Sequence, residues 1–187
     1  MFPINNIEIY SSGKIIKPEE VAVFVSKLKS FGKKVGLCLG CFDLLHPGHV
    51  KHLESAKKLC DYLIVAVTAD KFIISRKGSE RPIFNEQLRA YMLATLEVVD
   101  CVVIQNFEKG TELLELIKPS FYIKGPDIIN LDTPAINEER EMTKKVGGEM
   151  RYTRDPKWAT TDIIEFMSNL NNQEGSSSGT SPLHMGT

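Results

Sequence analysis

The segment GCFDLLHPGH, residues 40–49, joins two stretches of the chain that have different apolar patterns. Residues 34–40 (KVGLCLG) form the short apolar run that is typical of a buried strand. Residues 49–59 place their apolar side chains three and four positions apart, which predicts a helix. The segment is therefore expected to leave the carboxyl end of a strand and to enter the first turn of a helix.

Apolar runs and amphipathic segments alternate along the rest of the chain as well. Further strands are expected at residues 62–67, 101–104, 121–124 and 149–153, and helices at 17–31, 85–98, 113–117, 138–146 and 160–170. This alternation predicts an α/β fold with a doubly wound, mostly parallel five-stranded sheet and helices on both faces. Ligands of such sheets bind outside the carboxyl ends of the strands, so functional side chains are expected in the loops that follow them.

Length and composition indicate one folded domain at residues 1–170, with an N-terminal helical extension at 1–33. The 187 residues are 42% hydrophobic and 25% charged, and the formal net charge is −1, as in ordinary globular proteins. No apolar run reaches the roughly 20 residues that cross a bilayer, and the N-terminus lacks the pattern of a secretory signal. We therefore expect a cytoplasmic protein without membrane or nucleic-acid partners. The polar residues 171–187 are expected to be a disordered tail or a remnant outside the fold.

The four cysteines are too few and too irregularly spaced for a disulfide framework. Cys38 and Cys41 form a C-x-x-C pair, but no second pair completes a zinc site. Small buried side chains are therefore favoured over metal or redox chemistry.

His46 and His49 stand at the expected start of the helix, where a phosphate is bound favourably. A helix N-terminus offers unpaired N–H groups and a partial positive charge, Gly48 permits close approach, and Pro47 suits a first turn. Two imidazoles three residues apart can point at one anion and stabilise the charge that grows on phosphate in a pentavalent transition state. From spacing alone two alternatives stay open: a helix cap beside a surface residue, or a zinc pair that lacks a third ligand nearby.

The run GCFDLLHPGH resembles the signature of the cytidylyltransferase-like nucleotidyltransferases. Across residues 14–170 the arrangement is similar to bacterial heptose 1-phosphate adenylyltransferases and, more distantly, to glycerol-3-phosphate cytidylyltransferases. The resemblance implies a Rossmann-like fold that transfers a nucleoside monophosphate from ATP or CTP to a small phosphorylated acceptor and releases pyrophosphate. It also implies Mg2+ as cofactor and a homodimer or larger homo-oligomer. The residues that the motif marks are catalytic His46 and His49, and nucleotide-binding Gly40, Cys41, Phe42, Asp43 and Gly48.

A second matching segment, RKGSERP at residues 76–82, resembles the family's K-G-x-x-R-P loop. A flexible loop with three cations can close over a triphosphate and screen the charge of two anionic substrates. The resemblance implies Lys77 as a catalytic phosphate clamp, with Arg81 and Arg89 as nucleotide-binding residues. A solvated basic loop is the alternative.

Two further segments resemble nucleotide contacts of the family but depart from its pattern. KGPD at residues 124–127 is similar to K-G-G-D and implies contacts from Lys124, Gly125 and Asp127, although Pro126 removes an N–H donor. Arg154 with the later run Ala159-Thr160-Thr161 resembles R-x4-S-T-T and implies that Arg154, Thr160 and Thr161 hold the triphosphate, with Ala159 in place of a serine.

Lys51, one turn into the motif helix, is expected to meet the acceptor, with a solvated surface lysine as the alternative. The mixed charges of residues 138–145 are typical of an ordinary solvated helix face.

The acceptor expected first is a sugar 1-phosphate of the heptose type, with ATP. A CTP-dependent enzyme that acts on glycerol phosphate or another small phosphorylated alcohol is the alternative, followed by a nucleotide-binding module without catalytic activity. A nicotinamide-dependent oxidoreductase is disfavoured because no G-x-G-x-x-G follows the first strand.

Overall fold

The computed structural model of the chain describes residues 7–156 and 159–176. Within these ranges, five strands form one sheet in the order β3-β2-β1-β4-β5, and every neighbouring pair is parallel. The strands are β1 (Val35–Gly40), β2 (Tyr62–Thr68), β3 (Cys101–Gln105), β4 (Phe121–Lys124) and β5 (Glu149–Tyr152). The direction of winding reverses between β1 and β4, which is the point where doubly wound sheets bind their ligands. The predicted α/β fold is confirmed.

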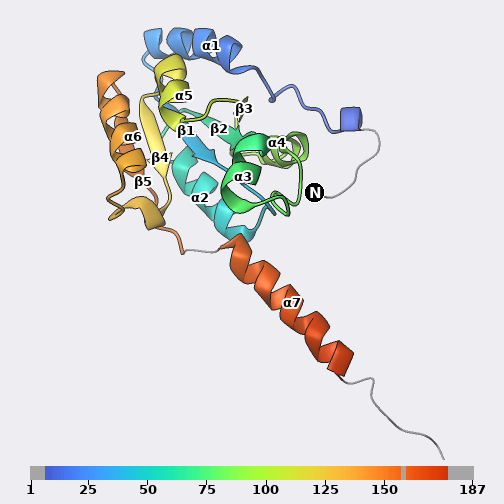
Figure 1. Cartoon of the computed structure of the whole chain (residues 1–187). Coiled ribbons are helices and arrows are strands. Elements are labelled where there is room, and N and C mark those ends of the chain that lie inside the picture. Colours follow the sequence, from blue (N-terminus) through green and yellow to red (C-terminus); the bar gives the residue numbers. More distant parts are fainter. Residues whose placement is uncertain (1–6, 157–158, 177–187) are drawn as a thin grey trace, which may run out of the picture. The chain divides into compact units, whose positions relative to one another are not determined.

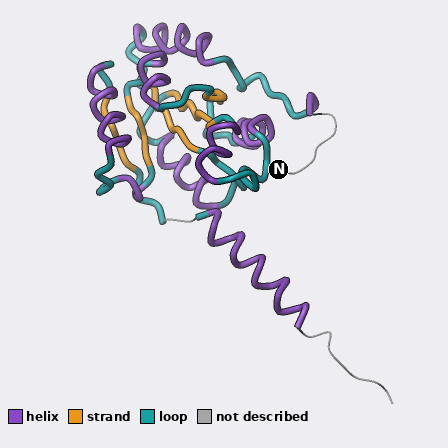
Figure 2. The backbone as a smooth tube through the Cα atoms, in the orientation of Figure 1, coloured by secondary structure: helices purple, strands orange, loops and turns teal. Residues whose placement is uncertain are grey.

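Helices cover both faces of this sheet (Figure 1). One face carries α2 (Pro47–Lys57) and α4 (Glu86–Ala94), and the other carries α1 (Pro18–Ser30), α5 (Gly110–Ile117) and α6 (Pro134–Lys145). Figure 2 shows the same arrangement, with the strands enclosed between helices. The two faces of the sheet are therefore buried under helices.

Strand β2 divides its side chains between the two cores. Leu63, Val65 and Val67 pack on the side of α2 and α4, whereas Ile64 and Ala66 pack on the side of α1 and α5. Because both sets are buried, the strand appears in the sequence as a continuous apolar run rather than an alternating one.

The structure contains a helix that the sequence analysis did not predict, α3 (Asp70–Lys77). Its N-cap residue, Ala69, makes no side-chain cap, and the backbone N–H of Asp70 instead donates to the Glu86 carboxylate at 2.7 Å. The helix ends at Gly78, whose φ of 89° suits a residue without a side chain. The basic segment at residues 76–82 was expected to be a flexible loop; this is wrong for Arg76 and Lys77, which form the last turn of α3.

The N-terminal extension is attached to the outer edge of the sheet. Ile15 pairs with Val102 of β3 in a parallel bridge, and the Lys14 ammonium donates to the carbonyls of Leu96 and Val99 at 3.0 and 2.7 Å. The extension before α1 is thus part of the fold.

The chain divides into two compact units, residues 1–157 and 158–187. The second contains α7 (Thr160–Ser176), whose last residues fall in the range 171–187. The expectation that 171–187 is a disordered tail or a remnant outside the fold stays a prediction. Residues 177–187 lie outside the described part of the chain. Among the described helices, none combines the length and apolar character needed to cross a membrane.

Candidate active site

The imidazoles of His46 and His49 lie together at the N-terminus of α2. His46 is the N-cap residue, and its Nδ1 accepts a hydrogen bond from the backbone N–H of His49 at 3.3 Å. The two rings are stacked, with centroids 3.7 Å apart and an interplanar angle of 19°, and the edge of Phe42 packs against His49. His46 is therefore a helix cap and, at the same time, one half of an imidazole pair.

Each of the two rings has a buried nitrogen to which no described residue is hydrogen-bonded. His46 Nε2 and His49 Nδ1 are buried and make no hydrogen bond with the residues that the structure describes. Because His46 Nδ1 accepts a bond, the proton of its neutral ring is assigned to Nε2. A buried donor without an acceptor is costly in a folded protein, so its presence at a helix N-terminus indicates an anion-binding site.

Burial favours the neutral form of both imidazoles. It lowers the pKa of His49 to about 3, and the neighbouring rings of His46 and His52 add to the effect. Burial also lowers the pKa of His46. Two neutral N–H donors at a positive helix end can stabilise phosphate oxygens without needing a bound proton.

Acidification is expected to destabilise the protein between about pH 6.5 and about 3. The His49 ring is protonated near 6.5 in the unfolded chain but near 3 in the folded one, so the unfolded state binds more protons across this window. The thermal unfolding midpoint, followed by circular dichroism, should therefore fall between about pH 7 and about pH 5. The midpoint should fall less in His49→Asn than in the unaltered protein. An identical fall in both would contradict the lowered pKa of His49.

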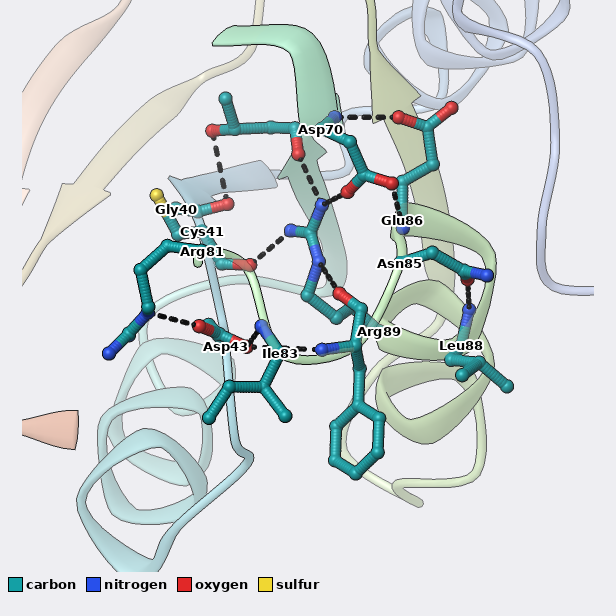
Figure 3. Close-up of polar contacts among 12 residues, drawn as sticks. Gly40, Cys41, Asp43, Asp70, Arg81, Ile83, Asn85, Glu86, Leu88 and Arg89 are labelled. Carbon is teal, nitrogen blue, oxygen red and sulfur yellow. Dashed lines mark hydrogen bonds and ion pairs between the residues drawn. The ribbon is translucent and has the colours of Figure 1, made fainter. Parts of the chain in front are cut away.

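The loop before α2 is held in an unfavourable backbone conformation. Phe42 and Leu44 have φ values of 49° and 50°, in the left-handed region that side chains disfavour. Between them Asp43 is buried, and its Oδ1 accepts a hydrogen bond from the backbone N–H of Ile83 at 2.9 Å. Its Oδ2 forms an ion pair with Arg81 Nε at 2.8 Å (Figure 3). Asp43 and Arg81 therefore connect the loop to the segment after α3.

Arg89 is fully buried and holds the same loop from its other side (Figure 3). Its Nε donates to the carbonyl of Phe84 at 2.9 Å, and one terminal nitrogen donates to the carbonyl of Thr68 at 2.8 Å and to Asp70 Oδ1 at 2.6 Å. The other terminal nitrogen donates to the carbonyl of Cys41. The expectation that Arg89 contacts the nucleotide is corrected: its side chain has no exposed surface and joins the ends of β1 and β2 to α4.

The first turns of α3 and α4 cap each other. Asp70 Oδ2 accepts the backbone N–H of Glu86 at 3.1 Å, in exchange for the bond that Glu86 accepts from Asp70, and Asn85 caps α4 through the N–H of Leu88. An acidic residue in the first turn of a helix is a sequence signal for such a cap. Here each acidic residue caps the other helix, and the neighbouring sequence does not show which helix that is.

A cavity of about 170 Å³ lies at the carboxyl ends of β1 to β4. Its lining comprises the strand-end residues Leu39, Gly40, Cys41, Thr68, Gln105 and Lys124, together with Arg76, Glu108, Gly110 and Glu139 from the adjoining loops and helices. Pockets that enclose drug-sized ligands measure roughly 300–1,000 Å³, so this one suits part of a substrate rather than a whole nucleoside triphosphate.

Glu139 lies at the charged end of this cavity. Its Oε2 pairs with the Lys124 ammonium at 2.7 Å, and its Oε1 accepts the hydroxyl of Tyr122 at 3.0 Å. A Cβ on Gly110 would lie 2.6 Å from Glu139 Oε1, so only glycine fits there without displacing the carboxylate. The prediction of an ordinary solvated helix face at residues 138–145 is therefore wrong for Glu139, because α6 packs this side chain toward the strand ends.

Comparison with known proteins agrees with this architecture. Residues 37–179 match the family described as cytidylyltransferase-like. The chain belongs to this family. It is thus a nucleotidyltransferase domain, as the HPGH segment predicted.

Two relatives illustrate the similarity to this cytidylyltransferase-like domain. The bifunctional protein HldE of Aliarcobacter butzleri is 44% identical over 133 residues, which are 70% of this chain and 28% of that protein. HldE of Pelobacter propionicus is 38% identical over 157 residues, which are 83% of this chain and 31% of that protein. The chain therefore spans less than one third of the length of these relatives.

Solved structures share the fold. The lipopolysaccharide core biosynthesis protein from Thermoplasma volcanium is 29% identical with a TM-score of 0.55, over 68% of this chain and all of that one. Pantoate-beta-alanine ligase from Francisella tularensis has a TM-score of 0.56 at 16% identity, over 92% of this chain and 82% of that one, and it supports the fold alone.

The remaining cytidylyltransferase-like motif residues lie mostly on the surface. Lys77 is exposed in the last turn of α3, where Arg76, not Lys77, lines the cavity. Lys51 is exposed and pairs with Glu54 at 2.7 Å within α2. Gly48 belongs to the first turn of α2. Direct contacts of Lys77, Lys51 and Gly48 with substrates stay predictions.

The KGPD and R-x4-S-T-T segments follow β4 and β5. Asp127 is exposed in a short 3-10 turn, Pro126–Ile128, directly after Gly125, and Arg154 is exposed just after β5. Thr160 and Thr161 begin α7 in the second unit of the chain.

The cysteines do not form a metal centre. All four are free thiols, and Cys38 and Cys101 are buried, which raises the pKa of Cys101 to about 12. In residues 7–156 and 159–176 no group of three or more His, Cys, Asp or Glu side chains is arranged to hold a metal ion. The interpretation of the cysteines as small buried side chains agrees with Cys38 and Cys101; Cys41 and Cys60 are half-buried.

Proposed function

We propose that this domain transfers a nucleoside monophosphate from ATP or CTP to a small phosphorylated acceptor and releases pyrophosphate. The observation that carries the proposal is the stacked pair His46–His49, which presents, at the start of α2, buried ring nitrogens that accept or donate no hydrogen bond within the described part of the chain. The N–H groups of the helix and the imidazole N–H groups together supply the donors that a phosphoryl-type transition state requires.

The reaction needs no covalent enzyme intermediate. An oxygen of the acceptor phosphate attacks the α-phosphorus in line, the bond from that phosphorus to the bridging oxygen breaks, and pyrophosphate leaves with the electron pair. His46 and His49 hold the oxygens on which negative charge grows, while Lys77 and Arg154 hold the triphosphate.

Mg2+, when bound, neutralises phosphate charge, and it is usually held by one or two carboxylates together with substrate phosphates. The chain fits this mode, because no protein cage of three or more ligands occurs in its described part and Asp127 exposes a carboxylate after β4. Asp127 would hold the ion, whereas Asp43 is engaged by Arg81.

The acceptor is proposed to be a sugar 1-phosphate. Glu108, Glu139 and Thr68 give the strand-end cavity oxygen atoms that can accept hydrogen bonds from sugar hydroxyls, and Arg76 adds a cation. One structural relative is named as a lipopolysaccharide core biosynthesis protein, which favours a sugar substrate. We also propose that the protein is cytoplasmic and forms a homo-oligomer. Gel filtration with light scattering would test the oligomeric state.

Pyrophosphate release decides between the nucleotides and between the acceptors. Each of the four nucleoside triphosphates is to be paired with heptose 1-phosphate, hexose 1-phosphates and glycerol 3-phosphate in the presence of Mg2+. We expect the fastest release with ATP and a sugar 1-phosphate. Activity with CTP alone would establish the cytidylyltransferase alternative, and nucleotide binding without release in any pair would establish a module without catalytic activity.

A further inference from the structure

The segment that carries Arg154 is tied to the catalytic helix at two points. His52 Nδ1 lies 2.8 Å from the hydroxyl of Thr153, and the hydroxyl of Ser55 donates to Asp155 Oδ1 at 2.8 Å. His52 and Ser55 both belong to α2, while Thr153 and Asp155 flank Arg154 on either side. The backbone of Arg154 is therefore held against α2 from both directions.

Strand β5 alone would not fix this segment. It is the last strand of the sheet and pairs only with β4, so its other edge lacks a neighbouring strand in the described sheet. The final bond along it runs from the N–H of Thr153 to the carbonyl of Lys124 at 3.0 Å, after which the chain leaves the sheet. The two contacts from α2 supply the restraint that a strand neighbour would otherwise give.

The same helix carries the phosphate-binding pair. His46, His49 and His52 follow one another at intervals of three residues, which places them along one side of α2. The influence of His52 on the pKa of His49 agrees with this proximity. The start of α2 therefore presents the imidazole pair, and its next turn holds the Arg154 segment.

We propose that His52 and Ser55 are positioning residues, which set the location of Arg154 relative to His46 and His49 through Thr153 and Asp155. The inference rests on the proposed function, in which Arg154 holds the triphosphate while the histidines act at the α-phosphorus. Both groups must reach one nucleotide at once, and a misplacement of about 1 Å can reduce the rate of a positioned reaction about 100-fold. A rigid link between the two groups satisfies this requirement.

The test is the double variant His52→Leu/Ser55→Ala, compared with Ser55→Ala alone and with His52→Asn, whose amide can replace Nδ1. We expect the double variant to raise KM for the nucleotide about tenfold, with a smaller change in kcat, and His52→Asn to restore most of the loss. Lys58→Ala, at the exposed C-cap residue of the same helix, is the matched control and should leave both constants unchanged. Circular dichroism confirms that each variant is folded.

The decisive measurement repeats the comparison in a protein that also carries Arg154→Ala. If the link acts through Arg154, the double variant changes KM little once Arg154 is absent, because the group that it positions has been removed. If the double variant instead raises KM by the same factor with and without Arg154, the link is overturned, whereas the proposed function is unaffected. Affinity for ATP, measured by calorimetry, should weaken in parallel; unchanged affinity in the double variant would overturn the link even if no turnover is detected.

Discussion

Replacing His49 with alanine is expected to lower kcat by about 100- to 1,000-fold and to leave the fold intact. Removal of one preorganised donor to a developing oxyanion has an effect of this size in other enzymes. His49 is the cleaner target of the pair, because His46 also caps α2 and its replacement would destabilise the helix by about 1 kcal/mol. The measurement is pyrophosphate release at saturating nucleotide and acceptor.

The substitution His49→Ala should lower kcat much more than it changes KM, because the imidazole is proposed to act on charge that appears in the transition state. Lys58→Ala, at the C-cap of the same helix, controls for a general effect of truncating a side chain near His49 in sequence. Unchanged turnover in His49→Ala would defeat the proposed mechanism. A raised KM with unchanged kcat would instead limit His49 to ground-state binding of the nucleotide.

The parts of the fold that depend on local pattern were predictable. Apart from α3, the strands and the longer helices show apolar runs or periods of their own, so their order and the position of residues 40–49 at a strand end follow from neighbouring residues alone. The closeness of His46 and His49 was predictable for the same reason, because both residues lie on one helical turn; their action on an anion stays a prediction.

Other features depend on contacts between segments far apart in the chain, and these were missed. Helix α3 receives its N-terminal cap from Glu86, sixteen residues downstream, and so lacked a local start signal. Glu139 appeared to be an exposed residue of a charged helix, but the packing of α6 and the small Gly110 bring it to Lys124. Arg89 matched a family position without revealing that its donors are directed inward.

Replacing Arg89 with methionine is expected to destabilise the protein by about 3–5 kcal/mol, the usual loss when one member of a buried ion pair is removed. The substitution leaves Asp70 without its buried cation and removes the guanidinium donors to the carbonyls of Cys41, Thr68 and Phe84. Asp70 keeps the hydrogen bond from the backbone N–H of Glu86, but the loss of one charged donor shared by several buried acceptors is costly. Urea unfolding followed by circular dichroism measures the loss as a lower midpoint at unchanged slope.

Two further variants distinguish the loss of the buried network around Arg89 from the loss of a positive charge alone. Lys145→Met removes a cation from an exposed ion pair with Glu115, in which the side chains are 67% and 59% exposed, and should change stability by less than about 1 kcal/mol. Arg89→Lys keeps the charge but not the planar fork that serves four acceptors, so its loss should lie between the two. Because Arg89 also holds the loop with the left-handed Phe42 and Leu44, folded Arg89→Lys should lose turnover as well as stability. Equal stability of Arg89→Met and Lys145→Met would show that the buried guanidinium does not hold this end of the sheet together.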